Sequence, residues 1–229
     1  MDPDFEISQD MILTGDLSRE NIERLQEKLN PKVIRLGSIA RSEANAPEIL
    51  PYEEELVDDI TEAIRNQREN IESIQTNPGS KFTVELYKMD LDRVQYMLKK
   101  YLRTRVLKIE RQLSAIMANI EMLDSLSPKE KKFAAELHQL NKTYFDETIN
   151  KRLGEIVREE FVKADDFYKH CQPDYEGFVI CRALRDCVDV EHFVDDESEN
   201  FKTFEKGEIF IIKYRCIHEY LKAGHLELL

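Results

Sequence analysis

Residues 91–120 of this chain have the sequence LDRVQYMLKK YLRTRVLKIE RQLSAIMANI. Apolar residues recur in it at spacings of three or four, which is the periodicity of one face of an α-helix. We predict one helix over residues 82–124, about 60 Å long at the usual rise per residue. A helix of that length indicates a mainly α fold. The apolar stripe consists of Leu91, Val94, Leu98, Leu102, Val106, Ile109, Leu113, Ile116 and Ile120.

The opposite side of this helix carries apolar and aromatic residues among basic ones. Because Tyr and Arg are enriched in protein interfaces, this pattern predicts a contact with another chain. The alternative is a solvated face with a few stray apolar residues, which is common on proteins. We favour the interface, because a helix with apolar residues on two sides needs cover on both. The residues of this predicted interface are Met89, Arg93, Tyr96, Lys100, Arg103, Leu107 and Arg111.

Arg105 lies inside the apolar stripe, between Leu98 and Ile109. A buried guanidinium needs a carboxylate partner, because an unpaired charge in a core is costly. We expect the carboxylate to come from the acidic run Glu53–Asp59 or from another subunit. Of the two roles open to Arg105, an internal salt bridge without a functional role is favoured over a part in assembly.

Capping and turn signals mark the other helices. A first helix is expected to begin at Ser18 and to end at Asn30-Pro31, followed by a loop over residues 31–46. A second helix should begin at Pro51 and end before residues 77–80, which are Asn-Pro-Gly-Ser. Ser127-Pro128-Lys129-Glu130 is the pattern of a capping box with proline at the first helical position, so it predicts the start of a fourth helix.

The pattern changes to short β-type runs after Pro173. Phe178–Cys181 and Glu208–Ile212 are predicted strands, with a turn at Lys206-Gly207 before the second. A short helix is expected over Cys216–Ala223, and a last strand after it. We therefore predict a flexible acidic tail over residues 1–16, a helical domain over 17–152, a linker over 153–172 and a small β-rich domain over 173–229.

Composition limits the classes of function. The chain has 229 residues, 41% of them hydrophobic, and a formal net charge of −13. That charge opposes general binding to nucleic acid or to an anionic membrane. From Lys81 to Arg111, however, nine basic residues stand against four acidic ones, which favours a local protein contact. We expect no signal peptide and no membrane span, because no apolar run approaches the roughly 18 residues a span needs.

No catalytic pattern is recognisable in the sequence. The seven glycines lie far apart, so there is no glycine-rich phosphate loop, and no residue has the surroundings of a hydrolase nucleophile. We expect no enzyme activity, no cofactor and no metal. The best metal set would join Cys181, Cys187, Cys216 and His218, but its spacing matches no structural zinc pattern. We interpret Cys181 and Cys216 as small core residues, with the cysteines present as reduced thiols.

Several segments resemble one family in the same order along the chain. Tyr101–Glu110, with the sequence YLRTRVLKIE, looks like the signature helix of the Sld-five family of GINS, the four-subunit complex of the eukaryotic replication fork. Ala46–Tyr52 resembles the segment before that family's second helix, and Leu126–Glu130 resembles the start of its fourth. The run from Gly207 to Leu229 is similar to its closing strand, helix and strand.

The resemblance implies a helical A domain, a β-rich B domain and a non-catalytic structural role. It implies assembly with the Psf-one, Psf-two and Psf-three subunits of GINS. Through that complex it implies the Cdc-forty-five factor and the minichromosome maintenance hexamer as partners, in the replicative helicase needed for initiation and elongation of DNA replication. Nuclear localisation is likewise implied by the resemblance. The alternative function is a helical adaptor subunit of another intracellular assembly.

The N-terminal tail has one further resemblance. Some fungal relatives dock an acidic N-terminal peptide on the replisome hub Ctf-four, and Asp10, Ile12, Leu13 and Leu17 are similar to that peptide. We favour the alternative of a disordered acidic tail, because Gly15 would weaken the short helix that such a peptide forms.

Overall fold

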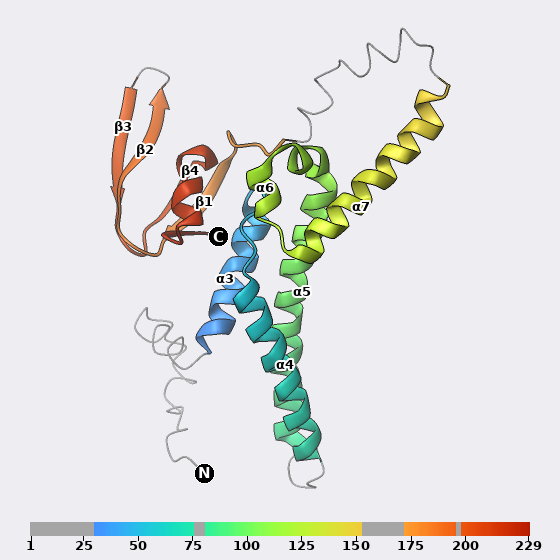
Figure 1. Cartoon of the computed structure of the whole chain (residues 1–229). Helices are drawn as coiled ribbons and strands as arrows, with labels where there is room; N and C mark the ends of the chain where they lie inside the picture. The colour runs from blue at the N-terminus through green and yellow to red at the C-terminus, as the bar shows by residue number, and fades with distance from the viewer. Residues whose placement is uncertain (1–29, 76–80, 153–171, 196–197) are drawn as a thin grey trace.

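The computed structural model describes residues 30–75, 81–152, 172–195 and 198–229. In this part of the chain, helices form a bundle with a long arm, and a small β-domain lies against one side of the bundle (Figure 1). The helices are α3 (Pro31–Asn45), α4 (Glu54–Gln75), α5 (Lys81–Ala118), α6 (Ile120–Asp124) and α7 (Pro128–Phe145), followed by the π-helix η1 (Asp146–Asn150).

Helix α5 is the spine of the bundle. It packs along α4 to form the arm, and α3 and α7 also pack against it, with the far half of α7 projecting away from the other helices (Figure 1). One core cluster joins α3, α4 and α5, and a second joins α5 to α7 and to the segment before α4. The mainly α fold class expected from the 91–120 pattern is confirmed.

The expectation of one unbroken helix over residues 82–124 is wrong at its C-terminal end. The backbone of Gln112 is non-helical (φ −107°, ψ 15°), and α5 ends at Ala118. The Asn119 side chain then accepts a hydrogen bond from the backbone N–H of Glu121 and caps α6. This break turns Ile120 outward, so it is 77% exposed instead of continuing the apolar stripe.

The expected loop over residues 31–46 is also wrong, because most of it is helix α3. Asn30 caps this helix through a hydrogen bond from the Lys32 backbone N–H to Asn30 Oδ1, and Pro31 occupies the first turn. Proline is favoured at that position, where its missing N–H costs nothing. Asn30-Pro31 therefore starts a helix where it was expected only to end one. Helix α4 begins at Glu54, three residues after the expected Pro51.

The capping box predicted at the start of the fourth helix is confirmed. The Glu130 backbone N–H donates to Ser127 Oγ, and the Ser127 backbone N–H donates to Glu130 Oε2 over 2.9 Å. Helix α7 begins at Pro128 as expected.

The C-terminal domain combines two antiparallel sheets with short helical turns. Its three-stranded sheet has the order β4-β1-β5, and β2 and β3 form a separate hairpin. The strands and turns are β1 (Phe178–Ala183), β2 (Cys187–Asp195), β3 (Ser198–Phe204), β4 (Ile209–Lys213), η2 (Tyr214–Cys216), α10 (His218–Lys222) and β5 (Leu226–Leu228). Gly207 and Gly224 have positive φ angles of 86° and 71°, which suits glycine at the turns before β4 and β5.

The predicted strands around Phe178–Cys181 and Glu208–Ile212 and the last strand are confirmed as β1, β4 and β5. The expected short helix over Cys216–Ala223 is present as α10, with η2 directly before it. Strands β2 and β3 were not predicted. Their sequences carry many acidic and polar residues, and the pairing of β2 with β3 has two register shifts, so the alternation that marks a strand is interrupted.

Candidate assembly interface

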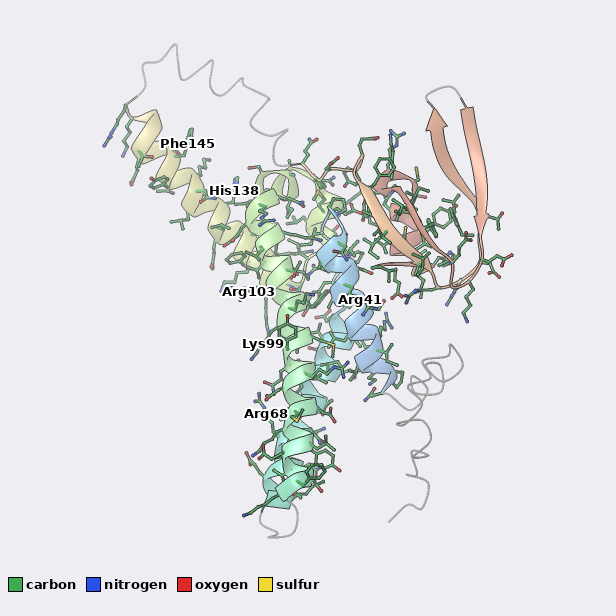
Figure 2. All side chains as sticks on the ribbon, turned by 180° about the vertical axis from the view of Figure 1, so that it is seen from behind. Arg41, Arg68, Lys99, Arg103, His138 and Phe145 are labelled. Carbon is green, nitrogen blue, oxygen red and sulfur yellow. The ribbon has the colours of Figure 1, made fainter. Side chains whose placement is uncertain are left out.

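The seven residues of the predicted interface all lie exposed on α5. The apolar members are uncovered to an unusual degree: Met89 is 68% exposed, Tyr96 66% and Leu107 43%. Figure 2 labels Arg103 and Lys99 on the length of α5 that carries this surface. We call the exposed stripe of α5 from Phe82 to Arg111 the α5 face.

The α5 face is longer than the sequence reasoning indicated, because Phe82 and Leu86 extend it toward the tip of the arm. Phe82 is 82% exposed and Leu86 47%. From Phe82 to Leu107 the exposed positions follow one another at alternating spacings of four and three, which is the spacing of helices that pack along each other. That alternation was visible in the sequence and could have found both residues. The positions are 82, 86, 89, 93, 96, 100, 103 and 107.

The polar members of the α5 face are cations. Within the part of the chain that the structure describes, Arg93, Lys100, Arg103 and Arg111 have no carboxylate within ion-pair distance. The α5 face therefore offers a row of apolar side chains with positive charges beside it. A complementary surface would combine apolar residues with carboxylates.

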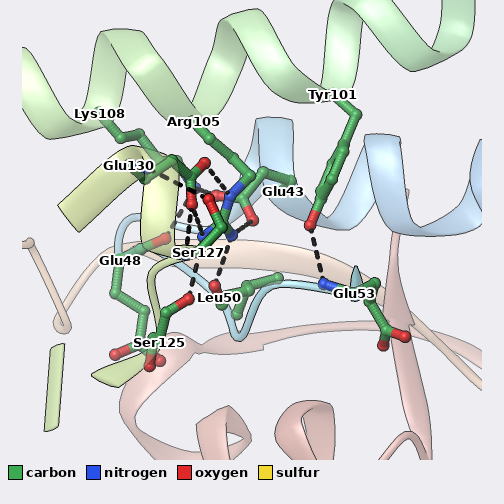
Figure 3. Close-up of polar contacts among 10 residues, drawn as sticks. All are labelled: Glu43, Glu48, Leu50, Glu53, Tyr101, Arg105, Lys108, Ser125, Ser127 and Glu130. Carbon is green, nitrogen blue, oxygen red and sulfur yellow. Dashed lines mark hydrogen bonds and ion pairs between the residues drawn. The ribbon is translucent and has the colours of Figure 1, made fainter. Parts of the chain in front are cut away.

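Arg105 lies on the opposite side of α5 from this face and is fully buried, with 0% of its surface exposed. A guanidinium has five N–H donors, and here five hydrogen bonds use them (Figure 3). Nε and one Nη bind both carboxylate oxygens of Glu130, at 2.8 and 3.1 Å. The other acceptors are Glu43 Oε2 at 3.0 Å and the carbonyl oxygens of Leu50 and Ser125 at 2.5 and 3.0 Å.

These partners correct the expectation for Arg105. The carboxylates belong to Glu43 on α3 and Glu130 on α7, not to the run Glu53–Asp59 and not to another subunit. Glu43 lies in the stretch predicted as a loop, so it was not considered as a partner. Through one side chain, α5 is tied to α3, to the chain before α4, to the turn before α7 and to α7 itself.

Two tyrosines complete the surroundings of Arg105. Its guanidinium carbon lies 5.3 Å from the ring centre of Tyr52 and 5.6 Å from that of Tyr101, within cation–π range. Burial alone lowers the pKa of Arg105, but hydrogen bonding to Glu130 and the charge of Glu43 outweigh it and raise the pKa above its ordinary value. The guanidinium therefore stays charged.

The buried side of α5 also differs from the predicted stripe near the middle of the helix. Tyr101 and Arg105 are buried, whereas Val106 is 38% exposed. The buried side of α5 thus runs through Leu98, Tyr101, Arg105 and Ile109. Tyr101 and Arg105 take the places that the predicted stripe gave to Leu102 and Val106, one residue further along the chain. A polar residue can be buried in a core when all its donors are satisfied, and the sequence pattern alone does not show where that happens.

Tyr101 makes the stability of the helical core sensitive to high pH. Burial raises the pKa of Tyr101 from 10.0 to about 12, because the phenolate would lose its hydration. A pKa that is higher in the folded than in the unfolded state adds to the free energy of unfolding. This contribution is fully present below pH 10 and is lost as pH rises from 10 to about 12. At about 1.4 kcal/mol per pKa unit, the loss due to Tyr101 is on the order of 3 kcal/mol.

We expect the free energy of unfolding to fall between pH 10 and 12, and Tyr101→Phe to make that fall shallower. Urea titrations followed by circular dichroism at several pH values measure it. Tyr144→Phe, at an exposed position on α7, is the matched control and should leave the fall unchanged. An equally steep fall in Tyr101→Phe and in the unaltered chain would contradict the assignment.

Among the described side chains, the cysteine and histidine set considered for a metal does not come together as a site. Cys181 is 0% exposed in the core of the β-domain, and Cys216 packs against the same core. Burial raises the pKa of Cys181 to about 12. His218 Nδ1 lies 3.0 Å from the carbonyl oxygen of Arg215, and the side chain of Cys187 lies outside the described ones. Among the described residues, no group of three or more His, Cys, Asp and Glu could hold a metal.

The remaining expectations concern a membrane span and the N-terminal segment. Across residues 30–75, 81–152, 172–195 and 198–229, no helix is long and apolar enough to cross a membrane. Asp10, Ile12, Leu13 and Leu17, the residues that resemble a hub-docking peptide, lie outside the described residues, as does the helix expected from Ser18.

Comparison with known proteins agrees with this architecture. Residues 52–149 match the family model described as the GINS complex protein helical bundle domain. Residues 173–229 match the model described as the C-terminus of the DNA replication complex GINS protein SLD5.

Individual relatives carry the same description. The DNA replication complex GINS protein SLD5 of Arabidopsis thaliana is 34% identical over 194 residues, which cover 82% of this chain and 87% of the relative. The protein of the same name from Schizosaccharomyces pombe is 27% identical over 189 residues, covering 82% and 87%. The human protein of that name is 26% identical over 202 residues, covering 85% and 87%.

The helical bundle and the matching models define the class of this protein as a GINS-type subunit. Within that class, the chain belongs to the SLD5 family of the DNA replication complex GINS. It is therefore a GINS complex subunit involved in DNA replication, and membership of the complex implies other GINS subunits as its partners.

Proposed function

We propose that this chain is a non-catalytic structural subunit that holds the GINS tetramer together through the α5 face. The observation that carries the proposal is the exposed row of apolar residues on α5 at alternating spacings of four and three. A row of that kind costs free energy when it faces water and is stable when a second helix covers it. The structural role also agrees with the naming of the relatives as subunits of a complex.

The chemistry of the α5 face limits the partner. The face has apolar side chains along its length and the cations of Arg93, Lys100, Arg103 and Arg111 beside them. We propose an amphipathic helix of a second GINS subunit as the occupant, with carboxylates flanking its apolar residues. Opposite charges at the rim of such a contact fix the register of the two helices and speed their encounter.

We propose different roles for the two domains. A helical domain over residues 17–152 carries the α5 face, and a β-rich domain over 173–229 follows a linker over 153–172. The limits of the two matching family models, 52–149 and 173–229, support this division. Because the α5 face is absent from the β-domain, the helical domain is the one we expect to nucleate assembly.

We further propose that the assembled complex joins the Cdc-forty-five factor and the minichromosome maintenance hexamer in the replicative helicase, in the nucleus. The role in DNA replication shared by the relatives supports this step. Docking on the Ctf-four hub through Asp10, Ile12, Leu13 and Leu17 rests on the sequence alone.

Co-expression tests the proposal. The tagged full-length chain, produced together with Psf-one, Psf-two and Psf-three, should purify as a single species of four subunits at equal amounts, measured by native mass spectrometry. In a cell extract it should also capture Cdc-forty-five and the minichromosome maintenance hexamer, and deletion of residues 1–17 should leave both unchanged. Loss of the hub from the deleted chain would favour hub docking over a disordered tail. A chain that purifies without the three subunits would contradict the proposal and favour an adaptor of another assembly.

A further inference from the structure

A short non-helical segment between α3 and α4 belongs to the cores of both domains. We call residues 46–50 the strap. Its backbone is extended at Ala46 (φ −72°, ψ 137°) and bends at Pro47 and Glu48, so its side chains do not all face the same domain. Ala46 and Leu50 pack in the core of the β-domain, whereas Ile49 packs in the core of the helical domain.

Glu48 lies at the centre of the strap and is only 4% exposed. Its carboxylate accepts hydrogen bonds from the hydroxyl groups of Tyr214, at 2.8 Å, and Tyr175, at 2.9 Å, and Lys222 Nζ lies 3.4 Å away. All three belong to the β-domain. The backbone carbonyl of Glu48 points the other way and accepts from Lys108 Nζ of α5 at 2.7 Å.

Further hydrogen bonds between α3 and the end of β5 join the same two domains. The Leu228 backbone N–H donates to Ser42 Oγ at 3.1 Å, and Asn45 Nδ2 donates to the Leu229 carbonyl at 2.6 Å. These two bonds have no side-chain carboxylate member, whereas those to Glu48 are made to a charge and are about twice as strong. A second carboxylate acts at the same contact, because the Ser38 hydroxyl of α3 donates to Glu227 of β5 and Arg41 lies 3.5 Å from it. Figure 3 shows Glu48 between the helices and the β-domain, below Lys108.

We propose that Glu48 is a positioning residue that, together with the contacts between α3 and β5, holds the β-domain on the helical domain, so that the two move as one rigid unit. A buried carboxylate without donors is unstable, so the strap is stable between the domains only while the two tyrosines reach it. The consequence goes beyond the proposed function. The outer face of the three-stranded sheet, where Phe178 and Ile211 are 71% and 66% exposed, keeps a constant orientation relative to the α5 face.

Amide hydrogen exchange resolved to single residues tests this proposal in the purified full-length chain. The Leu228 amide reports on the junction, because it donates to Ser42 of α3. The Ala183 amide reports on the β-domain itself, because it donates to the Glu208 carbonyl within that domain. In Glu48→Gln we expect exchange at Leu228 to speed up at least tenfold while exchange at Ala183 stays unchanged, because the amide removes the charge but preserves the shape.

Two companion variants make the result decisive. Tyr214→Phe removes one donor and should speed exchange at Leu228 less than Glu48→Gln does, with Ala183 again unchanged. Glu136→Gln makes the same chemical change at an exposed position of α7 and should change neither amide. The proposal is overturned if Glu48→Gln leaves exchange at Leu228 as it was, or if Leu228 and Ala183 accelerate together, since the β-domain would then be unfolding and not separating.

Discussion

Arg105→Ala should lower the free energy of unfolding by about 3–5 kcal/mol, the usual loss when one member of a buried ion pair is removed. The guanidinium is 0% exposed and satisfies two carboxylates and two carbonyl oxygens from different parts of the helical domain. Without it, Glu130 keeps only the backbone N–H of its own capping box, and Glu43 keeps only Lys108. The total free energy of unfolding of a domain is about 5–15 kcal/mol, so this loss is a large share of it.

Urea unfolding followed by circular dichroism measures the effect, and the melting temperature of the co-purified assembly measures it where the chain is insoluble alone. Arg68→Ala is the matched control, because it removes the same side chain at an exposed position of α4, outside the α5 face. It should change stability by no more than about 0.5 kcal/mol. A loss below about 1 kcal/mol in Arg105→Ala would show that the cluster contributes little.

The second large effect concerns assembly instead of folding. Tyr96→Asp combined with Leu107→Asp should abolish co-purification with Psf-one while the helical content stays near that of the unaltered chain. Both side chains are exposed on the α5 face, so the chain itself tolerates the charges. In an interface between helices the same carboxylates would be buried without donors, at several kcal/mol in all, and each 1.4 kcal/mol weakens binding tenfold.

The control for this pair is Ala63→Asp combined with Asn66→Asp. These positions are exposed on α4, so they add the same number of carboxylates to a neighbouring helix outside the α5 face. The control should assemble normally. If the Tyr96 and Leu107 double variant forms a normal tetramer, the α5 face is solvent-exposed in the complex, and the interface must be sought elsewhere on the molecule.

Much of the fold follows from local patterns. The periodicity of residues 91–120 indicated a long helix, and the capping box at Ser127 placed the start of α7 at the correct residue. These predictions succeeded because helix periodicity and caps depend on residues within a few positions of one another. The prediction failed for α3, because Asn30-Pro31 can end one helix and begin another, and for β2 and β3, where acidic residues interrupt the alternation.

The sequence by itself determined that α5 is long, that its two sides differ, and that Arg105 falls on the inner side. The tertiary structure alone decided which residues meet Arg105 and Glu48. Glu43 is 62 residues from Arg105 along the chain, and Tyr214 is 166 residues from Glu48. Contacts over such separations depend on how helices and domains pack, and packing depends on the shapes of many side chains together, which no local pattern contains.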